Sequence, residues 1–241
     1  MSIWGSLIGG MIGFSLGGPF GMLLGSLLGG KISRARAGAS FSNPAQSQQM
    51  FALSLIVLSA KLSKADGQVS KEELIAVKDK LKIPENELDQ VGKIFNQAKK
   101  ESAGYEPYAQ QIAQFYSGNI NVLEEVINIL FYIAESDGEV SSSELKMIEN
   151  ISKIFGLSET QYQSIKESRK GSDKLNPYIV LESKPDDDLQ TIRKRYLDLS
   201  KQHHPDLLLS KGVPKEVIEE SKNKMRAINS AWDQIQKLKK N

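Results

Sequence analysis

The chain begins with a long uncharged stretch, and this feature constrains its fold more than any other. From Ile3 to Gly30 there is no charged side chain. As an α-helix this stretch would be about 42 Å long, which exceeds the roughly 30 Å hydrocarbon core of a bilayer. A secretory signal should begin with positive charge, whereas here Lys31, Arg34 and Arg36 follow the apolar stretch. The sequence therefore predicts a retained single transmembrane helix over residues 1–33, with the amino end outside and the rest in the cytoplasm.

Glycine recurs at every fourth position of this stretch. The series comprises Gly5, Gly9, Gly13, Gly17, Gly21, Gly25 and Gly29. Four residues turn an α-helix by about 400°, so the glycines form a slowly winding groove without side chains. Small residues at this spacing let two membrane helices pack closely, and we expect a homodimer through this helix; an anchor that does not self-associate is the alternative. Pro19 is a candidate break that would allow a kink or a hairpin.

Composition excludes several classes of function. The 241 residues include no cysteine and two histidines, which removes disulfides, cysteine-ligated zinc, iron–sulfur clusters and thiol nucleophiles. A net charge of +2 gives no case for nucleic acid as the main partner.

Charge also divides the chain. Residues 1–43 hold three basic and no acidic side chains, residues 44–171 hold 14 basic and 18 acidic ones, and residues 172–241 hold 14 basic and 11 acidic ones. These differences indicate three parts.

An internal duplication organises the middle part. One apolar stripe at helical spacing contains Phe51, Leu55, Leu58 and Leu62, and a second contains Leu123, Ile127, Leu130 and Ile133 or Ala134. Each stripe leads into the same pattern, Asp-Gly-x-Val-Ser-x-x-Glu-Leu, and the two copies lie 71 residues apart. The pattern predicts a helix that ends at Asp-Gly and a following helix that begins with a capping box.

The four acidic residues of this repeat admit a second interpretation. Asp66, Glu73, Asp137 and Glu144 stand where the second half of a calcium loop has ligands. The first half lacks oxygen ligands in both copies, which excludes an EF-hand. Two half-loops could still share one divalent cation if the duplication brings the four carboxylates together. Structural capping and a cation site both remain open at this point.

The paired corners resemble the TerB-like all-helical domain of the tellurite-resistance family. The resemblance covers residues 47–170 and rests on the two Asp-Gly-x-Val-Ser-x-x-Glu motifs. It implies an all-α fold and an association with metal binding and membrane-linked stress functions. Residues 34–46, which precede this domain, read as a linker.

The remaining residues, 171–241, predict a helical hairpin. Asn176 and Pro177 begin a short helix, and acidic residues up to Asp188 begin a longer one. This longer helix must end near His203, since a proline disfavours helical geometry in the residue before it. Its apolar stripe is Leu189, Ile192, Tyr196 and Leu199, and its basic face is Arg193, Lys194, Arg195 and Lys201. Another helix is predicted from about Lys215.

Two helices joined at His204-Pro205-Asp206, the first with a basic face, strongly resemble a J domain. Together with the preceding parts, the order of domains is similar to that of membrane-anchored DnaJ-type co-chaperones. The resemblance implies that His204, Pro205, Asp206 and the basic face bind a DnaK-type chaperone and stimulate its ATP hydrolysis. Asp206 would pair with an arginine of the chaperone, and His204 and Pro205 would hold the loop in shape. Leu197 and Asp198 stand where many J domains have basic residues, so the basic face is weaker here.

The sequence thus predicts an all-α protein of the bacterial inner membrane that is not an enzyme, because catalysis would belong to the chaperone. No cofactor is expected beyond the candidate cation of the TerB-like domain. The expected partners are a DnaK-type chaperone, membrane lipid and a second copy of the chain. The alternative is a membrane stress-signalling scaffold in which the TerB-like domain senses a metal or a partner.

Overall fold

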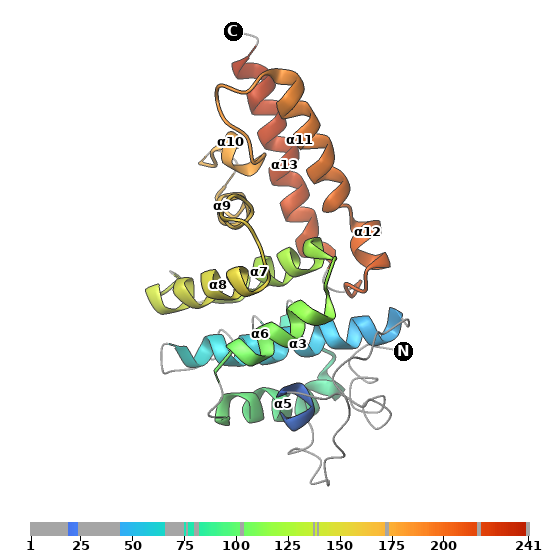
Figure 1. Cartoon of the computed structure of the whole chain (residues 1–241). Helices are drawn as coiled ribbons and strands as arrows, with labels where there is room; N and C mark the ends of the chain where they lie inside the picture. The colour runs from blue at the N-terminus through green and yellow to red at the C-terminus, as the bar shows by residue number, and fades with distance from the viewer. Residues whose placement is uncertain are drawn as a thin grey trace.

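The computed structural model describes residues 19–23, 44–65, 75, 77–79, 82–101, 104–136, 138, 140–171, 174–215 and 218–239. The regular structure in these ranges is helical, in line with the predicted all-α class. Figure 1 shows a layered lower body, from which the two longest helices of the carboxyl-terminal part rise side by side. The lower body contains α3 (Pro44–Ala65), the short 3-10 turn η2 (Glu85–Glu87), α5 (Leu88–Lys100), α6 (Glu106–Phe115), α7 (Ile120–Ala134), α8 (Ser142–Ile154) and α9 (Glu159–Ser168).

Helix α3 is the centre of the lower body, which we call the middle domain. Every residue from Met50 to Ser63 is buried, so the helix is surrounded by protein on all sides. It lies between α5 and α7 (Figure 1) and also contacts α6 and α8. Both predicted apolar stripes, on α3 and on α7, are buried in the core. The two repeated helices therefore pack against each other as the core of one domain.

The second copy of the repeated corner has the predicted capping box. The Ser141 hydroxyl accepts a hydrogen bond from the backbone N–H of Glu144 at 3.2 Å, and the Glu144 carboxylate accepts one from the backbone N–H of Ser141 at 2.9 Å. Gly138 has φ +134°, a conformation that side chains rarely adopt. The first copy, residues 66–74, lies outside the described residues.

The amino-terminal side differs from expectation in one place. Helix α3 begins at Pro44, so the predicted linker over 34–46 overlaps its first turn. Residues 19–23 are helical, and Phe20 is buried with its ring edge-on to Tyr108, at 5.0 Å between centroids. Among the described residues there is no helix of the length and apolar character that crossing a bilayer requires.

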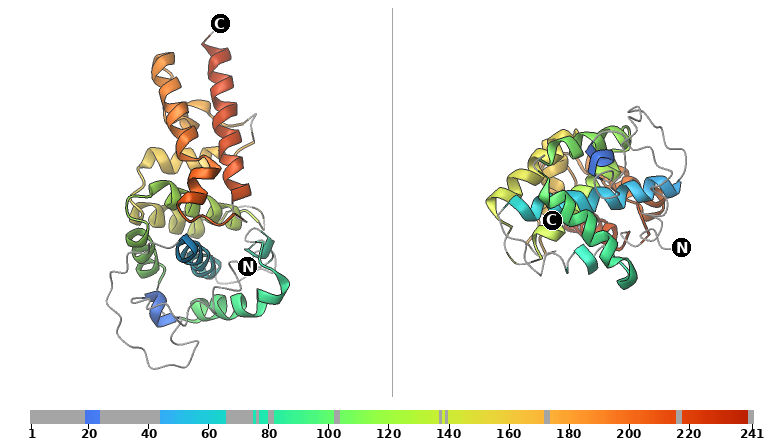
Figure 2. Two further views of the ribbon diagram at one scale, coloured as in Figure 1. Left: turned by 90° about the vertical axis from the view of Figure 1, so that its right-hand side faces the viewer. Right: turned by 90° about the horizontal axis from the view of Figure 1, so that it is seen from below.

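The carboxyl-terminal part, which we call the hairpin domain, has the predicted pair of long helices and one extra short helix. It contains α10 (Pro177–Val180), α11 (Leu189–Gln202), α12 (Pro205–Ser210) and α13 (Ile218–Leu238). Asn176 caps α10 and Asp188 caps α11, as the sequence indicates. Figure 2 shows α11 and α13 side by side, with the carboxyl terminus at the far end of α13 from the middle domain. Helix α12 was not predicted.

A separate apolar core holds the hairpin together. Ile192, Ile228 and Ile235 are fully buried in it, and the rings of Tyr196 and Trp232 stack at 5.2 Å between centroids. Leu189 was predicted to belong to this core, but its side chain is 41% exposed because it lies in the first turn of α11, ahead of the packed part. The rest of the predicted stripe faces the core.

The hairpin domain is joined to the middle domain by more than the chain connection. Leu208 on α12 and Val213 after it are fully buried, and they belong to the core of the middle domain rather than to the hairpin's own core. Helix α9 contacts both α10 and α13. The two domains therefore share a packed interface, which the sequence did not predict.

We expect Leu208→Ala to lower the free energy of unfolding of the full chain by about 3 kcal/mol, the usual cost of emptying a packed leucine site. Leu207→Ala, in the same short helix but half-exposed, should cost much less. Urea unfolding in detergent, followed by circular dichroism, measures both. Equal losses for the two variants would show that α12 is not packed against the middle domain.

Candidate functional site

The corner between α11 and α12 consists of His204, Pro205 and Asp206. Helix α11 ends at Gln202, and His204 is extended (φ −64°, ψ 130°), as expected before a proline. The Nδ1 atom of His204 accepts a hydrogen bond from the backbone N–H of Asp206 at 3.2 Å. His204 is therefore the N-cap of α12, with Pro205 at its first position.

The polar side chains of this corner face solvent. The side chain of His204 is 56% exposed and that of Asp206 is 86% exposed. The Asp206 carboxylate lies 3.8 Å from the His204 ring nitrogen that caps the helix. An incoming cation can therefore reach the carboxylate without any movement of the corner.

The predicted basic face is also on the surface. Arg193, Lys194, Arg195 and Lys201 are all exposed along α11. Leu197, three residues after Lys194 and four before Lys201, is 44% exposed on the same side of the helix. The exposed side of α11 thus combines positive charge with the apolar side chain of Leu197, and it ends at the corner.

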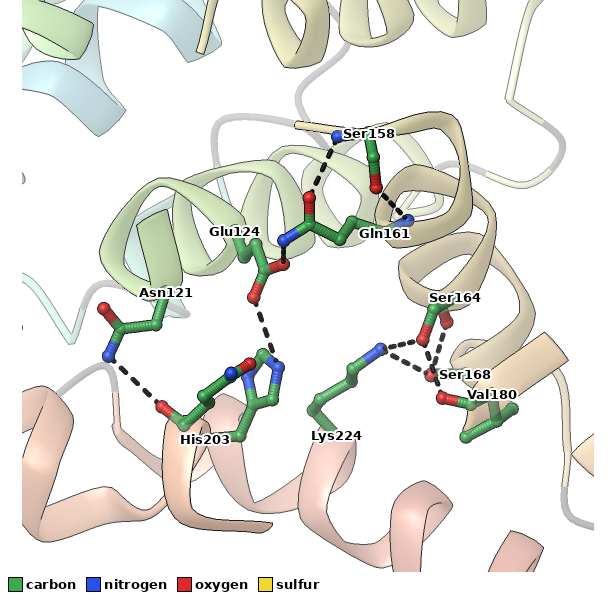
Figure 3. A network of polar contacts seen from close by, with 10 residues as sticks. Asn121, Glu124, Ser158, Gln161, Ser164, Ser168, Val180, His203 and Lys224 are labelled. Carbon is green, nitrogen blue, oxygen red and sulfur yellow. Dashed lines mark hydrogen bonds and ion pairs between the residues drawn. The ribbon is translucent and has the colours of Figure 1, made fainter. Parts of the chain in front are cut away.

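His203, which directly precedes the corner, points in the opposite direction. Its side chain is buried, and its Nε2 atom lies 3.2 Å from the carboxylate of Glu124 on α7, an ion-pair distance when the ring is protonated. Figure 3 shows the two side chains pointing toward each other across the interface between the domains. The sequence offered no distinction between the two adjacent histidines, because the partner of His203 comes from a helix about 80 residues earlier.

Glu124 remains ionised in this buried position. Burial raises its pKa, but His203, Lys224 and the side chain of Gln161 together hold the pKa of Glu124 below its ordinary value. Gln161 on α9 donates a hydrogen bond to the other carboxylate oxygen at 2.7 Å. The negative charge of Glu124 thus has partners from both domains.

Lys224 on α13 is another side chain of the hairpin that is buried at this interface. Its ammonium donates to the hydroxyls of Ser164 and Ser168 on α9, at 2.9 and 3.0 Å (Figure 3). Burial lowers the pKa of Lys224 to about 8, despite the opposing charges of Glu124, Glu182 and Glu125. This lysine was not singled out from the sequence, since a single lysine in a charged helix carries no signal of burial.

The short connection between the domains is held at both ends. The guanidinium of Arg169 binds the carboxylate of Glu135, at 2.6 Å, and the side-chain oxygen of Asn128, at 2.8 Å. Beyond it, the backbone N–H of Asn176 donates to Glu167 at 2.6 Å. A half-open pocket of about 480 Å³ lies beside Arg169 and is lined by Asn128, Tyr132, Glu135, Ser136, Ser168, Arg169, Asn223 and Lys224.

The candidate cation ligands are only partly described. Glu144 is buried and its carboxylate is engaged in the capping box by the backbone and hydroxyl of Ser141. Asp66, Glu73 and Asp137 lie outside the described residues. Within the described ranges no three acidic or histidine side chains gather as a metal site. The capping role of Glu144 is confirmed, and the shared cation site stays a prediction.

Of the glycine series, Gly21 lies in the short helix of residues 19–23, and Gly5, Gly9, Gly13, Gly17, Gly25 and Gly29 lie outside the described residues. The helix–helix contact predicted for the series therefore stays a prediction from the sequence.

The pKa of Lys224 gives a test of its burial. Between about pH 8 and 10.5 the folded protein binds fewer protons at Lys224 than the unfolded chain does, so this residue's contribution to stability rises with pH. Compared with Lys224→Met, the wild-type chain should gain up to roughly 3 kcal/mol of unfolding free energy across this range. Urea unfolding at a series of pH values measures the difference, and a difference that stays constant with pH would contradict the buried position.

Comparison with known proteins places these observations in a family context. The model of the Tellurite resistance protein TerB family matches residues 52–167, and that of the Co-chaperone DjlA transmembrane domain matches residues 1–39. The chain is 26% identical to the Co-chaperone protein DjlA of Escherichia coli K12 over 271 aligned positions, which cover 99% of each chain. It is 28% identical to the protein of the same name from Vibrio vulnificus, over 81% of this chain and 80% of that one. No solved structure matches the chain.

The TerB match coincides with the middle domain, and the transmembrane match coincides with the uncharged amino-terminal stretch. The corner of His204, Pro205 and Asp206 lies in the part that the full-length relatives also cover. The chain is therefore similar along its whole length to the co-chaperones named DjlA, with a match to the DjlA transmembrane domain followed by a match to TerB and by a helical hairpin.

Proposed function

We propose that this protein recruits a DnaK-type chaperone to the cytoplasmic face of the bacterial inner membrane and stimulates its ATP hydrolysis. The observation that carries the proposal is the exposed corner of His204, Pro205 and Asp206 at the end of the basic helix α11. The relatives that match the whole chain bear the name co-chaperone, which supports a chaperone as the partner.

Each residue of the corner has a distinct role in this proposal. Asp206, with its exposed carboxylate, pairs with an arginine of the chaperone. His204 caps α12 and so fixes the backbone that carries Asp206. Pro205 ends α11 and begins α12, which keeps the corner from joining the two helices into one.

The basic side of α11 brings the partner to the corner. Arg193, Lys194, Arg195 and Lys201 attract an acidic surface and orient it before contact. Association should weaken as salt rises, because exposed charges are screened over about 8 Å at physiological ionic strength. The hydrolytic groups belong to the chaperone, so the chain acts as a regulator rather than as an enzyme.

We expect His204→Gln to abolish stimulation of the chaperone's steady-state ATPase while the circular dichroism spectrum stays unchanged. The imidazole caps a helix of only six residues, so its loss alters the corner and little else. The full chain should be used in detergent, because Leu208 and Val213 are packed in the middle domain.

Lys211→Gln is a suitable control, since Lys211 is exposed at the other end of α12. It should stimulate as the wild-type chain does. Wild-type stimulation by His204→Gln would count against the proposed function.

The amino-terminal domain fixes the place of action in this proposal. Lys31, Arg34 and Arg36 follow the uncharged stretch and favour a cytoplasmic position for everything after them. The match to the DjlA transmembrane domain supports a membrane anchor. The glycine series supports a homodimer formed by two such helices in close contact.

Replacing Gly13, Gly17 and Gly21 together by leucine should strongly reduce self-association in a membrane reporter assay, because the added side chains would keep the two helices apart. A matched control replaces Gly10, Gly18 and Gly30, which lie off the fourfold series. The control should associate as the wild-type segment does. If both triple variants behave alike, the glycine series does not form the contact.

A further inference from the structure

The interface between the two domains ends beside the proposed chaperone-binding corner. Helix α11 approaches the middle domain with its last residues, and α12 continues along it (Figure 1). Residues on both sides of the corner are buried, whereas His204 and Asp206 are exposed. The corner is thus the exposed part of a segment that is otherwise fixed to the neighbouring domain.

We propose that Glu124 of the middle domain is a positioning residue for the chaperone-binding corner, which it orients by holding His203. This inference rests on the proposed function of the corner. It adds that the middle domain determines the fraction of molecules in which the corner has its binding orientation.

The first support is the geometry on the α11 side. The Glu124 carboxylate lies 3.2 Å from Nε2 of His203, and both side chains are 4% exposed. Asn121, one helical turn earlier on the same face of α7, donates a hydrogen bond to the backbone oxygen of Gln202 at 3.2 Å. Two neighbouring side chains of α7 therefore contact the two residues that directly precede the corner (Figure 3).

The second support is the packing on the α12 side. Leu208 and Val213 are fully buried in the core of the middle domain, and Ile218 at the start of α13 is 6% exposed in the same core. With His203 held on one side and Leu208 on the other, the intervening residues have little freedom to rotate relative to α7. The interface therefore determines the direction in which Asp206 points.

The third support is electrostatic. Glu124 and Glu125 of the middle domain and Glu182 of the hairpin domain contribute negative charge near the interface. The basic groups there, His203, Lys224 and Arg195, all come from the hairpin domain. A buried charge that loses its partner is strongly unfavourable. Neutralising Glu124 should therefore loosen the contact with His203 while the apolar cores of both domains stay intact.

A looser interface has a defined effect on binding. If only a fraction of the molecules present the corner correctly, the apparent affinity for the chaperone falls by that fraction, and stimulation at saturation is unchanged. A ligand of the middle domain that moved α7 would act in the same way. The positioning role thus differs from a direct contact with the chaperone, whose loss would lower the maximal stimulation.

The test uses Glu124→Gln in the full chain in detergent, titrated into the ATPase assay with a DnaK-type chaperone. Glutamine keeps the shape and the contact with Gln161 but removes the charge that faces His203. We expect the concentration for half-maximal stimulation to rise about tenfold, which corresponds to a coupling of ordinary size for contacting residues, at an unchanged maximum. Glu149→Gln, which removes the exposed charge that pairs with Lys153 within the middle domain, should leave this concentration unchanged.

A second measurement follows the orientation itself. Because the chain has no cysteine, Lys146→Cys and Lys237→Cys introduce two unique, exposed sites, one in each domain, for spin labels. The distance distribution should be narrow in the wild-type background and broad with Glu124→Gln. Asn121→Ala, a milder change at the same contact, should broaden the distance distribution less. This variant replaces Glu124→Gln in the test if Glu124→Gln does not have the native circular dichroism spectrum.

The outcomes separate the two proposals. If the wild-type chain does not stimulate the chaperone, the proposed function fails, and the spin-label distances still decide whether Glu124 orients the hairpin. If the wild-type chain stimulates, a Glu124→Gln variant with wild-type half-maximal concentration and a narrow distance distribution overturns the positioning role. A loss of maximal stimulation at an unchanged half-maximal concentration would overturn it as well.

Discussion

The carboxylate of Glu124 is buried between the two domains of this protein, where a negative charge is stable only beside positive charge and hydrogen-bond donors. His203 and Lys224 come from the hairpin domain and Gln161 comes from the middle domain, so the requirement is met only when the domains are docked. The neighbouring apolar contacts of Leu208 stabilise the docked state without favouring one orientation, because the hydrophobic effect is non-directional. The charged contacts restrict the orientation of the hairpin. The orientation of the hairpin follows from this combination.

This arrangement connects the anchor to the corner. The stretch that matches the DjlA transmembrane domain comes first in the chain, the TerB domain follows it, and the hairpin is docked on the TerB domain. A hairpin on a free tether would present His204 and Asp206 in all directions. A docked hairpin presents them in one direction relative to the TerB domain, which favours a chaperone that approaches from that side.

Local patterns were predictable from the sequence, and contacts between distant segments were not. The capping box of Ser141 and the end of α11 before Pro205 depend on a few neighbouring residues, and both are confirmed. The exposure of the basic face of α11 followed from helical periodicity. In contrast, the burial of His203 depends on α7, and that of Leu208 on the core of the middle domain. Leu189 was predicted to be buried and is exposed, because helical periodicity does not reveal where packing begins along a helix.

Hydrogen–deuterium exchange of the full chain, with and without a DnaK-type chaperone and ATP, tests the central claim most directly, because it locates the bound surface without any substitution. We expect the chaperone to slow exchange in α11 and in the corner at residues 203–206, where the exposed basic side chains and Asp206 lie. Exchange in α5, on the other side of the middle domain from the hairpin, should be unchanged (Figure 1). Slowed exchange confined to the middle domain, with none at the corner, would contradict the role of the hairpin as the chaperone-binding site.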